Sequence, residues 1–382
     1  MPALRFARLA VLVVLPLLAD APARAATAAE AAAWLRSLNV PVADAKGFVA
    51  PTAENVAELR WVSFARVPAA RLKAADLAKL QALPKLEEVV FGGNAATDAG
   101  VAEIVKAAPR LRRLWLFRSA VTDAAFPHVA TLGDLEALHL AGARISASAL
   151  VEVARLKKLR VLEIDDTDVG DAGLEAIRHM PALAEVSYKD MRDVGARGMA
   201  ALAGLRRLDS LHLAFAEVDD SIEKLAASRT LRQLNLLRAT VTDARAASIA
   251  KIKTLRVLVL SYTPITDGAL AHVSALPQLA TLELTRTRIT DDGVKALGQT
   301  RSLVVLDLTD TATTDDALDA LAGLPKLASL VLRGTKVTDA GAAKLARMKS
   351  LKHIDLAATA VTDEALKALA RALPEARVVG NE

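Results

Sequence analysis

A leucine pattern with a nearly constant interval runs through most of this chain. The pattern is L-x-x-L-x-L, with other apolar residues in place of some leucines, and consecutive copies begin 23 to 25 residues apart. Twelve copies begin at Leu86, Leu111, Leu135, Leu159, Leu183, Leu208, Leu231, Leu255, Leu279, Leu303, Leu327 and Leu351, and a weaker one begins at Leu59. A period in the twenties restricts the fold to an array of similar small units, each packed on its neighbours.

Each repeat carries the pattern of one strand followed by one helix. Apolar residues alternate at the fourth and sixth positions, as in a short strand with one buried face. Later apolar pairs such as Leu174 and Ile177 lie three residues apart, which is the spacing of one helical stripe. Prolines end the helix before several strands, at Pro84, Pro109, Pro181, Pro277 and Pro325. Such a unit cannot bury its apolar face alone, so the units must stack into a solenoid.

The composition agrees with a folded chain made of many small layers. Hydrophobic residues make up 53% of the sequence and charged residues 24%, which is not a disordered composition. Aromatic residues contribute only 3%, so the apolar content is mainly Ala, Leu and Val. The chain has no cysteine, which excludes disulfides, thiolate metal sites and a cysteine nucleophile.

Over residues 59–373 the repeats resemble those of the leucine-rich repeat family, in its ribonuclease-inhibitor-like, bacterial secreted form. The resemblance implies an α/β leucine-rich repeat solenoid, shaped as a horseshoe or arc, with a concave parallel β-sheet and convex short helices. Proteins that are similar serve mainly as interaction scaffolds, inhibitors or recognition surfaces. Many secreted relatives cap their ends with cysteine clusters, which this chain cannot do.

An aspartate stands at the thirteenth position of ten of the twelve repeats, and a threonine precedes it in eight of them. These aspartates are Asp98, Asp123, Asp171, Asp220, Asp243, Asp267, Asp291, Asp315, Asp339 and Asp363. Because the pair directly precedes the helical stripe, we interpret the carboxylates as helix N-caps, each contributing about 0.5–2 kcal/mol. A row of calcium sites is the alternative, but the dense acidic ligand set of a calcium loop is missing.

A second threonine row precedes these pairs. It comprises Thr167, Thr263, Thr287, Thr311, Thr335 and Thr359, and we expect it to bond the backbone in the turn that leaves each strand.

The two ends of the sequence predict a signal peptide and two caps. Residues 1–25 combine Arg5 and Arg8, an apolar run of eleven residues and a small-residue site ending at Ala25. This run is too short to cross a hydrocarbon layer of about 30 Å, so we expect a signal peptide and a periplasmic or secreted protein. A membrane anchor or a buried helix is the alternative.

We assign residues 26–58 to an N-terminal cap and residues 374–382 to a C-terminal cap. The first contains a helix with Trp34, Leu35 and Leu38 on one side, followed by irregular sequence that runs through Phe48 to Thr52. The second contains Val378 and Val379, which we expect to close the sheet as a short strand. Caps are needed because a terminal repeat otherwise exposes its core.

Charge and motifs argue against several functions. Cleavage after Ala25 removes three arginines and Asp20, which leaves 46 basic and 43 acidic residues, too small an excess to favour nucleic acid. The sequence lacks a nucleophile elbow, a zinc helix, a phosphate loop and a dinucleotide fingerprint. We therefore expect no catalytic residues, metal site or cofactor, no membrane contact after cleavage, and no enzyme activity.

Residues that point outward from the strands form the surface left for binding. Trp115, His139 and Glu163 occupy the fifth position of consecutive repeats and should be neighbours, about 4.8 Å apart between strands. With Phe117 beside the first and Asp165 beside the third, they form a candidate site whose aromatic rings would anchor a partner. Alternatively, the rings pack under the N-terminal cap or against the next strand. For His139 and Glu163 the options are an acid–base pair, a metal site or a cross-strand hydrogen bond.

Further candidates lie on the central repeats. His212 shares the fifth position, and an aromatic and basic edge occupies the eighth position at Phe215, Arg238, Tyr262 and Arg286. The repeats from Leu135 to Leu231 also lose parts of the regular pattern, which marks either function or drift. We expect a protein ligand on the concave face. The alternatives are a cell-envelope polysaccharide, an enzyme that uses the His139 and Glu163 region, and a purely structural spacer.

Overall fold

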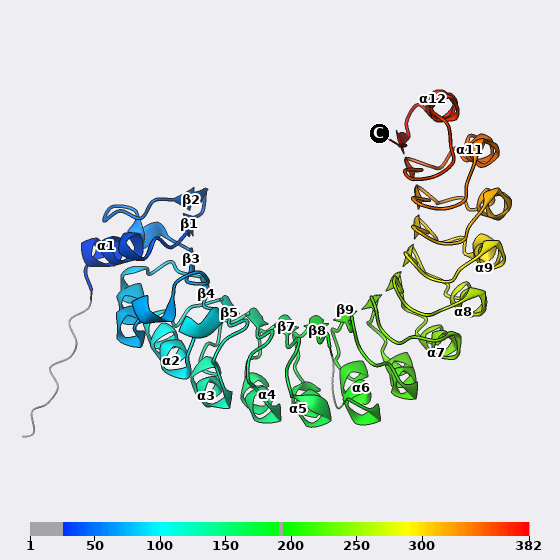
Figure 1. Cartoon of the computed structure of the whole chain (residues 1–382). Coiled ribbons are helices and arrows are strands. Elements are labelled where there is room, and N and C mark those ends of the chain that lie inside the picture. Colours follow the sequence, from blue (N-terminus) through cyan, green and yellow to red (C-terminus); the bar gives the residue numbers. More distant parts are fainter. Residues whose placement is uncertain (1–25, 191–193, 382) are drawn as a thin grey trace, which may run out of the picture.

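The computed structural model describes residues 26–190 and 194–381, which form an open arc of stacked repeats (Figure 1). A single sheet lines the inner, concave side and the helices cover the outer side. The predicted α/β solenoid is therefore confirmed. The predicted signal peptide, residues 1–25, lies outside the described residues and stays a prediction. Within the described ranges no helix is long and apolar enough to cross a membrane.

The sheet has sixteen strands of three residues each, in the order β16 to β3 followed by β1 and β2. Strands β3 to β16 pair in parallel and in chain order, whereas β1 pairs antiparallel with both β3 and β2. The strands are β1 (Val42–Asp44), β2 (Gly47–Val49), β3 (Trp61–Ser63), β4 (Glu88–Val90), β5 (Arg113–Trp115), β6 (Ala137–His139), β7 (Val161–Glu163), β8 (Glu185–Ser187), β9 (Ser210–His212), β10 (Gln233–Asn235), β11 (Val257–Val259), β12 (Thr281–Glu283), β13 (Val305–Asp307), β14 (Ser329–Val331), β15 (His353–Asp355) and β16 (Arg377–Val379).

The helices are short, and several segments are 3₁₀ rather than α. The α-helices are α1 (Ala28–Leu38), α2 (Asp98–Ala107), α3 (Phe126–Val129), α4 (Ala147–Val153), α5 (Gly170–Ile177), α6 (Ala196–Ala203), α7 (Asp243–Ile249), α8 (Asp267–Val273), α9 (Asp291–Ala296), α10 (Leu318–Leu321), α11 (Asp339–Leu345) and α12 (Asp363–Ala372). The 3₁₀ segments are η1 (Val56–Glu58), η2 (Ala69–Arg71), η3 (Ala74–Ala82), η4 (Gly93–Ala95), η5 (Asp123–Ala125), η6 (Asp220–Ala227), η7 (Leu297–Gln299) and η8 (Asp315–Ala317).

The alternation within each strand separates the core from the concave face. Leu138 of β6 pairs in register with Leu162 of β7, and both side chains are fully buried between the sheet and the helices. The next residues, His139 and Glu163, pair in the same register but point to the concave side and are only half-buried. Within a three-residue strand such as β7, the middle side chain therefore packs in the core and the two flanking side chains lie on the concave face.

At the two ends of the solenoid the structure shows the helix and the strand that the sequence predicted, with one correction. Trp34, Leu35 and Leu38 are buried on one side of α1, and β16 contains Val378 and Val379, as the sequence predicted. The prediction of irregular structure after this helix, through Phe48 to Thr52, is wrong in part, because Val42–Asp44 and Gly47–Val49 form the antiparallel hairpin of β1 and β2. The hairpin was hard to foresee because it is stabilised by pairing with β3, a contact between distant segments. The boundaries at residues 58 and 373 stay predictions.

The second threonine row behaves as predicted. Each of its hydroxyls donates a hydrogen bond to the backbone carbonyl three residues earlier, at 2.5–2.7 Å, at the turn that leaves the strand. Five of the six threonines are buried, so these bonds satisfy polar groups inside the solenoid.

The interpretation of the aspartates as helix caps needs correction. In most pairs the threonine caps its own helix, as Thr290 does by accepting from the N–H of Asp292, whereas Thr242 and Thr266 make no such bond. The aspartate carboxylate instead crosses to the next repeat, where it accepts from a threonine or serine N–H at 2.7–2.9 Å and from its hydroxyl at 2.5–3.0 Å. These bonds join Asp98, Asp123, Asp243, Asp267, Asp291, Asp315 and Asp339 to Thr122, Ser146, Thr266, Thr290, Thr314, Thr338 and Thr362. We name this set the aspartate ladder.

Candidate partner-binding surface

The predicted group at Trp115 is joined by contacts across four strands. The indole nitrogen of Trp115 donates to the Glu88 carboxylate at 2.8 Å, and the indole ring stacks on the His139 ring with centroids 3.5 Å apart. His139 Nδ1 in turn lies 2.7 Å from Glu163 Oε2. Of the options that the sequence left open, the structure shows the cross-strand hydrogen bond for His139 and the packing against a neighbouring strand for Trp115.

The flanking residues Phe117 and Asp165 are also engaged within the sheet. The Phe117 ring lies over Gly92, where an added Cβ would stand 3.0 Å from its edge. Asp165 is buried and accepts from the Ser187 hydroxyl at 2.7 Å, and it forms an ion pair with Lys189 at 2.8 Å. Burial alone would raise the pKa of Asp165, but the hydrogen bonds from Lys189 and Ser187 outweigh it and lower the pKa below its ordinary value.

His212 stands apart from this group, further along the face. Its Nε2 lies 3.0 Å from the Ser210 hydroxyl and 3.7 Å from the Glu185 carboxylate. Within the described ranges no group of three or more His, Asp or Glu side chains has the arrangement of a metal site.

The eighth position of every repeat has a left-handed backbone, with φ between 46° and 70°. These residues are Gly93, Arg118, Gly142, Asp166, Asp190, Phe215, Arg238, Tyr262, Arg286, Asp310, Gly334 and Ala358. Phenylalanine, tyrosine and arginine pay a steric cost for this conformation, which glycine avoids. The bend follows each strand directly, so these residues form one rim of the concave face.

Four of these residues, Phe215, Arg238, Tyr262 and Arg286, form a continuous stack that we name the rim row. The Arg238 guanidinium lies 5.7 Å from the Phe215 ring centre and 4.9 Å from that of Tyr262, and Arg286 lies 5.6 Å from Tyr262. Phe215 is 48% exposed and Tyr262 is 38% exposed, whereas most large apolar side chains of the described chain are buried. The rim row therefore places two rings and two cations in solvent.

The backbone of the rim row is fixed by the repeats themselves. The N–H groups of Phe215, Arg238, Tyr262 and Arg286 each donate to a carbonyl of the following repeat, at 2.7–2.9 Å. At the far end Arg286 forms an ion pair with Asp310 at 2.8 Å, a partner that the sequence reasoning missed. Asp310 occupies the eighth position of the next repeat, so the constant period contained the information needed to find it.

The floor beside the rim row carries two adjacent carboxylates that the sequence reasoning did not select. Glu283 of β12 pairs in register with Asp307 of β13. Burial and the Asp307 carboxylate together raise the pKa of Glu283. Asp307 itself accepts a hydrogen bond from the Thr285 hydroxyl at 3.2 Å. The two carboxylates therefore lie in the same repeats that contribute the ion pair of Arg286 and Asp310 to the rim.

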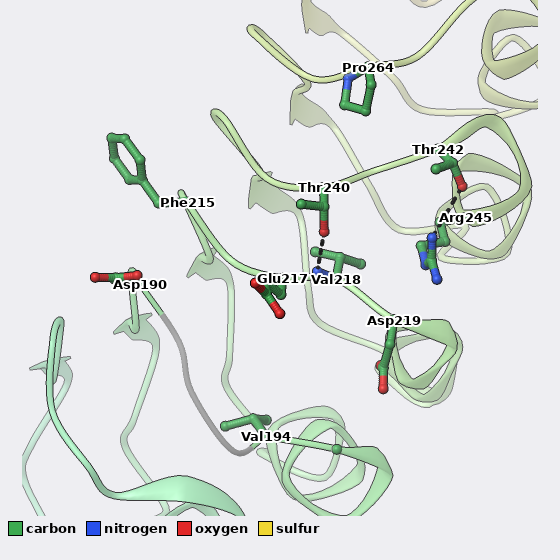
Figure 2. A pocket seen from close by; sticks show the side chains of 11 residues that line it. Asp190, Val194, Phe215, Glu217, Val218, Asp219, Thr240, Thr242, Arg245 and Pro264 are labelled. Carbon is green, nitrogen blue, oxygen red and sulfur yellow. Dashed lines mark hydrogen bonds between the residues drawn. The ribbon is translucent and has the colours of Figure 1, made fainter.

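An open hollow of about 1090 Å³ adjoins Phe215, between the loops that connect strands to helices (Figure 2). Its wall includes Glu217, Asp219, Thr242 and Arg245. Here the aspartate ladder is interrupted, because Asp220 points into solvent with 98% of its side chain exposed, 3.8 Å from Arg245 Nε. The hollow thus coincides with one of the irregular repeats noted in the sequence.

The repeats also match known families. Residues 102–316, more than half of the 382-residue chain, match the family described as "Leucine-rich repeat region". The chain belongs to the leucine-rich repeat family. Residues 347–370 match a second description, "Leucine Rich repeat". No curated protein sequence gives a significant match.

Two solved structures show how widely this leucine-rich repeat arc is shared. An internalin (inlF) from Listeria monocytogenes is 18% identical with a TM-score of 0.54, over 86% of this chain and 94% of the internalin chain. TLR13, solved in a complex with ssRNA13, is 16% identical with a TM-score of 0.56, over 86% of this chain and 52% of its own. At these identities the likeness shows the fold alone.

Proposed function

We propose that this leucine-rich repeat protein is a non-catalytic scaffold that binds a protein partner on its concave face and along the rim row. The observation that carries the proposal is the stack of Phe215, Arg238, Tyr262 and Arg286, held in solvent on a strained but hydrogen-bonded backbone. The repeat imposes this left-handed bend at the eighth position of every copy, so the large side chains placed there, and not the bend itself, distinguish the rim row. Aromatic rings and arginines are also the residues that contribute most to protein interfaces.

The remaining candidates contribute to the same face in a different way. Trp115, His139 and Glu163 already use one another as partners, and Asp165 is held by Lys189. We assign them to shaping the N-terminal half of the face, together with Phe117 and His212. We propose a structural role for His139 and Glu163 within the sheet face, where the imidazole stacks on Trp115 and its Nδ1 bonds to Glu163.

The location and the class of partner complete the proposal. The signal-peptide pattern of residues 1–25 supports a periplasmic or secreted protein, and N-terminal sequencing of the purified protein should then begin at Ala26. A cell-envelope polysaccharide is the second candidate partner, because the exposed rings of Phe215 and Tyr262 can stack on sugars as well as on protein side chains.

The test uses residues 26–382 as bait for proteins of the native envelope fraction, followed by binding measurements with the purified partner. The double variant Phe215→Ser/Tyr262→Ser should lose the partner while keeping the wild-type far-UV spectrum and melting temperature. Val151→Ser is the matched control, because Val151 of α4 is 55% exposed on the convex side. Equal binding by all three proteins would overturn the proposal, and capture of glycans alone would favour the polysaccharide.

A further inference from the structure

Arg238 differs from Arg286, the other charged residue of the rim row, in the contacts that its guanidinium makes. It lies between Phe215 and Tyr262, and its central carbon is 5.7 Å from the first ring centre and 4.9 Å from the second. Cation–π attraction acts on the charge of the guanidinium and uses none of its N–H donors, so these contacts leave the donors available to a further partner. The flanking rings also restrict the side chain, which reduces the entropy that binding would cost.

The neighbouring cation shows what this edge can accept. Arg286 occupies the same repeat position with the same left-handed backbone, and its Nε donates to the Asp310 carboxylate at 2.8 Å. Among the described residues, Arg238 makes cation–π contacts and no ion pair. The rim row thus contains one guanidinium with a carboxylate supplied by the protein and one without.

We propose that Arg238 binds a carboxylate of an acidic side chain on the protein partner, in the way that Arg286 binds Asp310. The inference rests on the proposed function and adds the chemistry of the partner at one position. A carboxylate matches the planar, two-pronged donor edge of arginine, and charge-assisted bonds of this kind are stronger than neutral ones. Arg238 then determines specificity, while Phe215 and Tyr262 hold its guanidinium in position.

The test is selection of binders from a random twelve-residue peptide library displayed on phage, with residues 26–382 as the target. We expect the enriched peptides to share an Asp or Glu at one position. When the variant Arg238→Glu is the target, the enriched peptides should carry Lys or Arg at that position. Arg238→Met should weaken an enriched peptide by about tenfold or more. Replacing the peptide's acid by its amide should cause the same loss, and combining the two changes should add little.

The outcomes separate this inference from the proposed function. Peptides that need Phe215 and Tyr262 but carry no shared acid would overturn the role of Arg238 and leave the proposed surface intact. No enrichment, or enrichment unchanged in Phe215→Ser/Tyr262→Ser, would count against the surface and the inference together. A third outcome is that the peptides share no acidic residue but are displaced by polygalacturonate. The carboxylate that Arg238 binds would then belong to a sugar, which would contradict a protein partner. Circular dichroism of each variant provides the folding control.

Discussion

The carboxylate of Asp267 holds the first turn of the next repeat by two hydrogen bonds to Thr290. One oxygen accepts from the Thr290 N–H at 2.8 Å and the other from its hydroxyl at 2.6 Å. The Thr290 hydroxyl oxygen accepts in turn from the N–H of Asp292 at 3.4 Å. Helix capping and the junction between repeats are therefore parts of one hydrogen-bonded chain. This explains why threonine and aspartate recur together at the twelfth and thirteenth positions.

Removing one ladder carboxylate should loosen the junction that it bridges. Asp291→Ala leaves the Thr314 N–H and hydroxyl without their acceptor, and we expect unfolding to become easier by about 1–2 kcal/mol. Chemical denaturation measures the change. Asp292→Ala is the matched control, since the Asp292 side chain is 83% exposed and only pairs with Lys295. If both variants lose the same free energy of unfolding, the hydrogen bonds of the aspartate ladder do not stabilise the junction between repeats.

A glycine stands one or two residues after several ladder aspartates. At Gly268, Gly293 and Gly341 it makes room for the ladder carboxylate of the preceding repeat. A Cβ on Gly293 would overlap the Asp267 carboxylate. Gly293→Ala should therefore displace this carboxylate and destabilise the protein. The double variant Asp267→Ala/Gly293→Ala has no carboxylate at position 267 for the new methyl group to displace. We expect the double variant to be more stable than the sum of the single changes by about 1 kcal/mol in denaturant titrations. Strict additivity would mean that the two residues act independently.

The left-handed backbone of the rim row has a measurable cost. Phe215 has a φ of 61°, which glycine adopts freely and alanine does not. We expect Phe215→Gly to be more stable than Phe215→Ala by about 1 kcal/mol, against the usual order of these two residues. Thermal unfolding of the two variants provides the comparison. The reverse order would mean that the backbone at this bend carries no strain.

The raised pKa of Glu283 predicts a pH-dependent effect. Because folding raises this pKa, the folded state binds the proton more tightly, and ionisation of Glu283 disfavours folding at neutral pH. Glu283→Gln should therefore melt at a higher temperature than the wild type at pH 7. The difference should shrink as the pH falls through the raised pKa to the ordinary range of a glutamate. A variant less stable than the wild type at pH 7 would contradict this sign.

The solenoid could be predicted because its information is local and repeated. The period of about 24 residues set the strands and the threonine row that Thr287 and Thr311 represent, since both bond within their own turn. The direction of the Asp291 carboxylate could not be predicted, because the same pattern permits a bond within its own repeat or to the next. The β1–β2 hairpin escaped for a similar reason, since its stability depends on pairing with β3.

The candidate surface was predicted in position but not in contacts. The eighth-position row was visible as Phe215, Arg238, Tyr262 and Arg286, yet nothing in the sequence fixed the stacking of Arg238 between two rings. Trp115 and His139 were expected to be neighbours, and whether they bind each other or a partner depended on ring orientation. Side-chain direction on a sheet face is set by all neighbours at once, which a linear pattern does not specify.

The central claim is that the partner contacts the rim row, and hydroxyl-radical footprinting of the purified complex tests it most directly. Exposed aromatic rings are readily oxidised, so Phe215 and Tyr262 should be oxidised in the free protein and protected in the complex. Phe48, which is 78% exposed on the N-terminal cap, should be oxidised equally in both states. Protection of Phe48 with full oxidation of Phe215 and Tyr262 would contradict the account and move the interface to the cap.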